Sequence, residues 1–204
     1  VAHPSPWITT VAAGTHPRGT VRRYLAEGAT GPFFATTFAV LNAGATTAHA
    51  LWRFQRDDGG IVTRPFRVPP RTRLTLEAAT VAGIDAASFA TLAEADTSLV
   101  IDRTMTWDGR RYGSHTETAL AGPDTTWYLA EGATTGGFRL YYLLQNPQTT
   151  PTTATITYLR PAPAAPVVRT YTLPAEARVS IDVNVVPGLG ATDVSAVVAA
   201  TAPI

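Results

Sequence analysis

The chain has 204 residues, of which 45% are hydrophobic and 15% charged, a balance typical of folded domains rather than disordered segments. The formal net charge is +1 and the basic residues are scattered arginines, so neither nucleic acid nor an anionic membrane is an expected partner. The absence of cysteine excludes disulfides and thiolate metal sites. The sequence contains no stretch of about 20 apolar residues, so membrane insertion is not expected.

The chain begins with a segment that precedes any recognisable module. We interpret residues 1–20 as an N-terminal extended segment, without the charged and apolar regions of a secretory signal peptide. Its first twelve residues include two large apolar side chains, Trp7 and Ile8.

An internal repeat follows this segment. The string Tyr24–Thr30, of sequence YLAEGAT, returns unchanged at residues 128–134, and Asn42 and Asn146 match at the same separation. The repeat predicts two modules rather than one large domain. We place the first at residues 21–110, a linker at 111–126 and the second at 127–204.

Period-two alternation marks the strands within each module. In the segment 34–40, alternate residues match apolar residues of 138–144, and the same alternation continues through 50–54. Further strands are predicted at 62–68, 73–76, 89–94 and 99–107, which with a short strand at Tyr24 makes about seven strands in the first module. This spacing predicts an all-β fold of two tandem immunoglobulin-like antiparallel β-sandwiches.

A helix at residues 78–95 is the alternative suggested by the alanines there. It is disfavoured because the matching segment 183–198 is rich in β-branched residues and is interrupted by Pro187 and Gly190. The acidic turn Asp57–Asp58 is interpreted as a hairpin tip rather than a calcium site, because the second copy has prolines instead of carboxylates.

The repeats resemble a family of tandem YLAEG-type immunoglobulin-like modules found in large secreted bacterial surface proteins. The resemblance covers most of residues 22–204. It rests on Thr125–Gly132, the turn Gln145–Pro147, the loop Val186–Gly190 with Thr192–Val198, and Arg103–Trp107. It implies display, spacing or adhesion at the cell surface, with no associated chemistry; the first copy departs from the pattern at Gly83–Ala87.

The second module is predicted to lack its last strand, because Ile204 matches Leu99 and nothing corresponds to Val100–Trp107. A sandwich without an edge strand exposes unpaired backbone. Either the sequence stops inside a longer array, or residues 1–12, with Trp7 and Ile8, supply the strand to a neighbouring chain. The expected partners are therefore other copies of the chain or neighbouring modules.

The glutamates of the two strings, Glu27 and Glu131, are candidates for structural locks rather than for catalysis. A carboxylate bound to an arginine such as Arg103 pins a strand end, and we expect Tyr24 and Tyr128 to belong to the same lock. Retaining glycosidases need two carboxyl groups about 5 Å apart, which one glutamate per module does not supply. We expect no enzymatic activity and no cofactor.

Other candidate sites are weaker. The four histidines lack metal-ligand spacing, so no metal site is expected. The aromatic residues Trp52, Phe54, Phe66 and Tyr158 alternate onto the inward face and are predicted to be core residues. Outward-facing Tyr141, beside Arg139, is the better candidate for binding surface glycans. The sequence predicts a non-enzymatic extracellular structural or adhesive protein; the alternative is a carbohydrate-binding accessory module of a secreted hydrolase.

Overall fold

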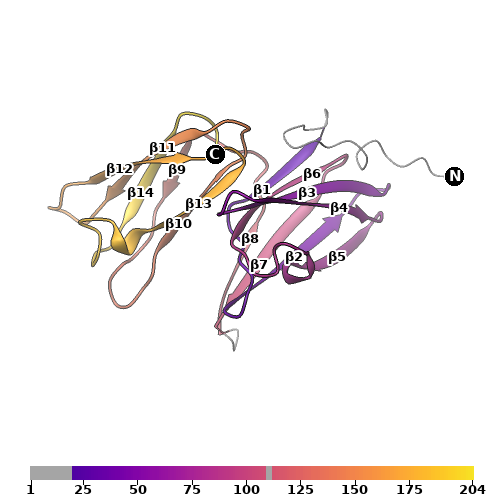
Figure 1. Cartoon of the computed structure of the whole chain (residues 1–204), viewed down its shortest axis with the longest axis horizontal. Helices are drawn as coiled ribbons and strands as arrows, with labels where there is room; N and C mark the ends of the chain where they lie inside the picture. The colour runs from indigo at the N-terminus through magenta and orange to yellow at the C-terminus, as the bar shows by residue number, and fades with distance from the viewer. Residues whose placement is uncertain (1–19, 109–111) are drawn as a thin grey trace. The chain divides into compact units, whose positions relative to one another are not determined.

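The computed structural model describes residues 20–108 and 112–204, in which all regular elements are β-strands except two single-turn 3-10 helices (Figure 1). The chain divides into two compact units, of which unit 1 extends to Gly122 and unit 2 covers Pro123–Ile204. The all-β sandwich fold predicted from the alternation is confirmed. Within the described ranges, no helix is long or apolar enough to cross a membrane.

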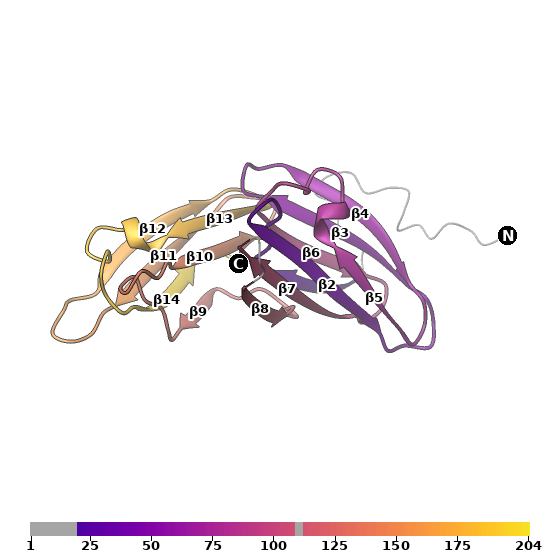
Figure 2. The same cartoon turned by 90° about the horizontal axis from the view of Figure 1, so that it is seen from below.

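Unit 1 consists of two antiparallel four-stranded sheets, with strand orders β1-β6-β3-β4 and β5-β2-β7-β8 (Figure 2). The central strands β2 and β3 each pair on both edges. The strands are β1 (Val21–Leu25), β2 (Phe34–Asn42), β3 (Ala48–Arg56), β4 (Ile61–Val68), β5 (Thr72–Glu77), β6 (Phe89–Ala95), β7 (Val100–Trp107) and β8 (Gly113–Thr118).

The core of unit 1 lies between these two sheets and is built around aromatic rings. Phe38 of β2 makes an edge-to-face contact with Trp52 of β3, with ring centroids 5.0 Å apart, and Phe54 contacts Phe89 of β6 in the same way at 5.4 Å. Edge-to-face packing suits the quadrupoles of these rings. The four side chains are almost completely buried, which explains the strict alternation in the sequence.

The outward faces of β3 and β6 in unit 1 are also buried. Leu51 and Arg53 alternate with the core residues of β3, and Leu92 and Glu94 alternate with those of β6, yet all four are buried. The counterparts of β3 and β6 in unit 2 instead show alternating burial. The two repeats therefore differ in how much of this sheet is shielded from water.

Unit 2 repeats only part of this architecture. One sheet has the order β12-β11-β14-β9, which corresponds to the β4-β3-β6-β1 sheet of unit 1, and the other pairs only β10 with β13. The core includes Tyr142 and Tyr158, whose rings stack 5.8 Å apart with an interplanar angle of 5°. The strands are β9 (Thr126–Leu129), β10 (Tyr141–Asn146), β11 (Thr152–Leu159), β12 (Val167–Leu173), β13 (Ala177–Asp182) and β14 (Ser195–Ala200).

The second sheet of unit 2 has fewer strands than the sequence predicted, since that prediction was the absence of one strand. Among the described residues, counterparts are missing for both β7 and β8, not for one strand. The prediction of a linker at residues 111–126 is also corrected, because this segment contains strand β8. In β8, residues from Gly113 to Thr118 pair with β7, so this segment completes unit 1 rather than running as an extended connection.

The segment that offered a helical alternative holds only one 3-10 turn, η1 (Ala78–Thr80), before strand β6. In unit 2 the corresponding turn is η2 (Val183–Val185). The acidic segment Asp57–Asp58 forms the tip of the β3-β4 hairpin: Asp58 Oδ1 accepts a hydrogen bond from Gly60 N at 2.9 Å, and Gly59 adopts a φ of +84°. Its carboxylate thus serves the turn.

Candidate functional site

The repeated string begins on β1 in unit 1 and is held by backbone contacts. Tyr24 is paired with Leu120, and each backbone N donates to the other's carbonyl, at 3.0 and 2.9 Å. Gly28 lies against the buried ring of Phe89, and a Cβ at this position would be 2.4 Å from the Phe89 Cε2 atom. The glycine in the string is therefore required by a close approach of the backbone to the core.

A charged cluster forms where this string meets β7 and β8. Arg103 of β7, only 1% exposed, donates from Nη1 to Glu27 Oε2 at 3.0 Å and from Nη2 to Glu117 Oε2 at 2.8 Å. His115 of β8 places Nε2 2.6 Å from the same Glu27 oxygen. The structure thus brings together Glu27 and Arg103, the pair suggested by the sequence, with two residues of β8.

In this Glu27 cluster (Glu27, Arg103, His115 and Glu117), the Arg103 guanidinium lies between the carboxylates of Glu27 and Glu117. The buried guanidinium is shared between two carboxylates, an arrangement that stabilises a buried cation and orients all three groups. Within the described ranges, no group of three or more acidic, histidine or cysteine side chains could hold a metal ion. The geometry ties β7 and β8 to the loop that follows β1.

Sequence reasoning missed His115 and Glu117 because their segment was interpreted as a linker. The available signal was the alternation of Ser114, Thr116 and Thr118 with these two residues, which is typical of an edge strand that has no apolar face.

In unit 2 the same string lies in a different environment. Tyr128 is 76% exposed, whereas Tyr24 is 8% exposed, and Glu131 is exposed without an ion-pair partner among the described residues. A Cβ on Gly132 would lie 2.7 Å from Leu140 Cδ2, so this glycine is also needed for a close approach, although to a different side chain. The lock formed around Glu27 is not reproduced around Glu131.

Two asparagines at matching positions form a contact that both units share. Asn42 is fully buried and donates from Nδ2 to Val68 O at 2.9 Å, while Asn146 donates to Leu173 O at 3.2 Å. Each Nδ2 also reaches two further carbonyls, and each Oδ1 accepts from the backbone N two residues later. These side chains bind backbone groups at a loop, in place of strand pairing. The sequence showed that the two asparagines match in the repeat, but it did not show this role.

The last residue of the string anchors the loop before β6 or β14. Thr30 Oγ1 accepts from Ala87 N at 3.1 Å, and Thr134 Oγ1 accepts from Thr192 N at 3.0 Å. The anchor is retained although the loop sequences differ, since the segment Gly83–Ala87 lacks the Pro-Gly-Leu-Gly sequence of its counterpart. A departure in loop sequence therefore leaves this hydrogen bond unchanged.

A buried ion cluster on the outward face of unit 1 had no clear sequence signal. Glu94 is 0% exposed and accepts from Arg53 Nε at 3.1 Å and from Arg22 Nε at 3.2 Å. In unit 2 the aligned positions of Glu94, Arg53 and Arg22 hold Ala199 and two threonines. The cluster is therefore particular to unit 1.

The candidate glycan residues lie together on unit 2. Arg139 donates from Nη2 to Asp182 Oδ2 at 2.5 Å and to the Tyr141 hydroxyl at 3.0 Å, and its guanidinium carbon lies 5.8 Å from the centre of the Tyr141 ring. The hydrogen bond to Asp182, followed by that to Tyr141, raises the pKa of Arg139 above its usual value. Tyr141 remains 48% exposed and offers a ring with a fixed cation beside it.

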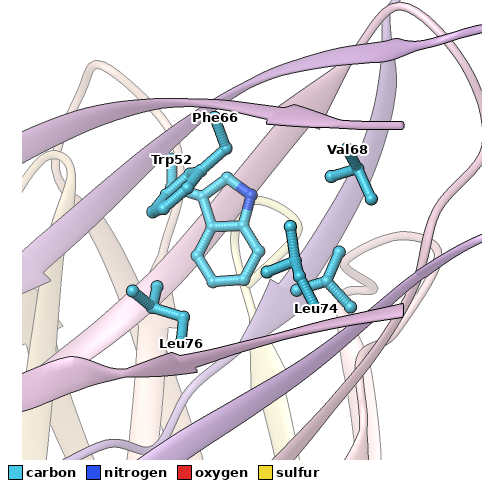
Figure 3. A pocket seen from close by; sticks show the side chains of 6 residues that line it. Trp52, Phe66, Val68, Leu74 and Leu76 are labelled. Atoms are coloured by element: carbon cyan, nitrogen blue, oxygen red, sulfur yellow. The ribbon is translucent and has the colours of Figure 1, made fainter. Parts of the chain in front are cut away.

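The aromatic residues predicted to be core residues are buried between the sheets. Beside Trp52 and Phe66, a narrow apolar gap between β4 and β5 leaves no room for a water molecule (Figure 3). Besides the Trp52 indole, its lining is aliphatic and aromatic: Val40, Phe66, Val68, Leu74 and Leu76. The Trp52 Nε1 has no hydrogen-bond partner among the described residues. These rings do not form an exposed platform. The strand-donation candidates Trp7 and Ile8 lie outside the described residues.

Comparison with protein-family models found no match, and comparison with curated proteins found none. Several solved structures are similar to parts of the chain, and two of them are described here. The crystal structure of Thermotoga maritima 1070 is 15% identical with a TM-score of 0.46, covering 51% of this chain and 96% of that one. The Anabaena sensory rhodopsin transducer is 22% identical with a TM-score of 0.36, covering 43% of this chain and 97% of that one.

Proposed function

We propose that the chain is a non-enzymatic structural or adhesive repeat protein of the bacterial cell surface or exterior, in which sandwich units in series act as spacers. The observation that carries this proposal is the kind of residue that the two units share. The shared polar side chains include the buried anchors Asn42 and Asn146 and the threonines Thr30 and Thr134, which hold loops in place. Conserving anchors while changing the surface is typical of a repeated building block.

The charged groups support the same proposal. A catalytic acid or base must be able to gain or lose a proton at a substrate. Glu27 instead contacts both Arg103 and His115, and its counterpart Glu131 has neither partner among the described residues. A catalytic role for this glutamate would therefore be possible in only one environment of the two. A structural role does not require the two units to have the same glutamate contacts, because each unit has only to fold.

Assembly into a filament is part of the proposal. The donor would be residues 1–12, with Trp7 and Ile8 as anchors, adding a strand to a neighbouring copy. Light scattering on a variant lacking residues 1–20 tests this step: loss of the higher-mass species is expected, and unchanged assembly would contradict the donation.

The spacer function predicts two results for the full chain. Pulled between its ends by optical tweezers, it should extend in two discrete steps, one for each unit. On a glycan array it should bind nothing. A single cooperative step, or specific binding to a glycan, would contradict the spacer function.

A carbohydrate-binding accessory module is the second candidate, and the Arg139–Tyr141 pair favours it. Exposed aromatic rings stack on sugar faces, and the hydrogen bonds from Arg139 to Asp182 and Tyr141 restrict the ring and the cation to one arrangement. Glycan binding that is lost in Tyr141→Ala, but retained in the matched control Tyr112→Ala on unit 1, would establish this alternative.

A further inference from the structure

Four exposed arginines gather on one lateral edge of unit 1. This arginine edge consists of Arg64 and Arg67 on β4, Arg71 in the turn that follows, and Arg73 on β5. Residues 59–76 contain these four arginines and no aspartate or glutamate, so the segment has a formal charge of +4. The net charge of +1 for the whole chain therefore hides a local concentration of positive charge.

The fold places these arginines along the seam between the two sheets of unit 1. Strand β4 ends the β1-β6-β3-β4 sheet and β5 begins the β5-β2-β7-β8 sheet, so each pairs on one side only among the described residues. Both strands lie on the same side of the unit (Figure 1, Figure 2), and residues of both line the gap beside Trp52. In the turn between them, Arg71 has a φ of 51° and its N donates to Gly44 O at 3.1 Å.

The register shows that the arginine edge presents cations on more than one side of this seam. Arg67 is opposite His49, on the outward row of its sheet. Arg64 is opposite the core residue Trp52, so it lies on the row that faces the seam. Arg73 lies on the outward row of the second sheet. A flat surface cannot contact both outward rows, but a chain laid along the seam is within reach of these long side chains.

The arginine edge has no acidic partner within the unit. Among the described residues, none of its four guanidinium groups forms an ion pair. The carboxylates that flank the segment have other partners: Asp58 pairs with Arg56 at 2.5 Å, and Glu77 accepts from Thr37 Oγ1 at 2.9 Å. The positive charge is therefore available to an external anion.

Unit 2 builds the same pair of strands without this concentration of charge. Strands β12 and β13 keep the register of β4 and β5 with their neighbours. Only one exposed arginine remains among the four counterparts, which are Arg169, Thr172, Glu176 and the buried Arg178. The fold therefore does not require the arginine edge, and its presence in unit 1 indicates a role in binding.

We propose that the arginine edge binds a linear phosphodiester polymer of the cell surface, of the poly(glycerol phosphate) kind, laid along the seam between β4 and β5. Guanidinium groups bind phosphate oxygens through paired hydrogen bonds, and a polymer of repeated phosphates offers an anion to each arginine. Arg64 and Arg67 are three residues apart, so their Cα atoms lie about 10 Å apart along β4. The inference rests on the proposed adhesive function and names the chemical class of its ligand.

The arginine edge fits such a polymer better than it fits nucleic acid or a membrane. Proteins that bind single-stranded nucleic acid stack its bases on accessible aromatic rings. The aromatic ring of this edge, Phe66, instead packs on Trp52, with ring centroids 5.1 Å apart. A membrane is a flat surface and would meet only one of the two outward rows that carry Arg67 and Arg73.

Binding of labelled poly(glycerol phosphate) to the full chain, measured by fluorescence anisotropy, tests the proposal. Binding should be saturable, and the slope of log K against log salt concentration should be about −3 for four phosphate contacts. The double variant Arg64→Gln with Arg67→Gln should bind at least about 10-fold more weakly and with about half this slope. The matched control, Arg160→Gln with Arg169→Gln on the corresponding hairpin of unit 2, removes the same charge and should bind like the original chain.

The outcomes separate the alternatives. Absence of saturable binding, or equal weakening by the two double variants, overturns the inference and leaves the arginines as charges that protect an edge strand. Tighter binding to anionic phospholipid vesicles or to single-stranded DNA, at equal phosphate concentration, also overturns it and assigns the edge to a membrane or to nucleic acid. The spacer function is tested separately by the force measurement, and the polymer has no sugar ring that a glycan array would report.

Discussion

Replacing Asn42 by alanine removes a side chain that is fully buried and satisfies several backbone groups at once. Its Nδ2, which carries two hydrogens, lies 2.8 to 3.1 Å from the carbonyl oxygens of Val68, Thr46 and Pro69, and its Oδ1 accepts from Gly44 N at 2.9 Å. Alanine cannot replace any of these contacts. The loops on both sides lose the groups that hold them together.

The expected cost follows from the number of groups left unpaired. The Val68 carbonyl is held in a buried contact, and the other groups lie nearer to solvent, where water replaces part of the loss. A buried group left unsatisfied costs about 1–3 kcal/mol, so with the partly exposed groups we expect a loss of about 3 kcal/mol in unit 1. Such a loss corresponds to roughly a 100-fold decrease in protection from exchange through unfolding.

Hydrogen exchange measured by mass spectrometry reports the protection of backbone amides in each unit separately. Protection of β2 and β4 should fall in Asn42→Ala, while peptides of unit 2 remain unchanged. The matched variant Asn146→Ala should reverse this pattern, because Asn146 makes the same contacts in unit 2. A loss smaller than about 0.5 kcal/mol in both variants would refute the role given to these asparagines.

The remaining predictions concern the string and the tyrosines of unit 2. Gly28→Ala places a Cβ 2.4 Å from the buried Phe89 ring and should destabilise the chain by about 1–3 kcal/mol in thermal denaturation; an unchanged melting temperature would show that the ring moves aside freely. Burial, aided by the hydrogen bond with Tyr171, raises the pKa of Tyr158. Because the folded state holds this proton more tightly than the unfolded state, the stabilisation is complete below about pH 10 and is lost as the pH rises further. Urea denaturation between about pH 8 and pH 11 should therefore show a smaller loss in Tyr158→Phe than in the original chain, and equal losses would contradict this assignment.

Strand positions were largely predictable because one face of most strands is buried. The alternation around Phe38 and Trp52 reflects a packed core, and the repeat carried the prediction into unit 2. The β8 strand was missed because Gly113–Thr118 has no apolar face. An edge strand held by charged partners gives no hydrophobic period to detect.

The polar contacts were harder to predict than the strands. The link from Glu27 to Arg103 was predicted because an arginine on a nearby strand can bind a carboxylate and pin a strand end, but its extension to β8 depends on strand pairing. Glu94 and Arg53 alternate outward, and charged outward residues normally indicate a solvated face. Their burial depends on tertiary packing, which residue alternation alone does not encode.

The contacts of Gly28 and Gly132 bear on how an array of such units can change in length. Each glycine makes room for a side chain that follows it in its own unit, Phe89 in one case and Leu140 in the other. A genetic crossover within the identical string would therefore join the first part of one unit to the remainder of another without separating either glycine from the neighbour it accommodates. Units could be gained or lost at this point with no new steric conflict at either glycine.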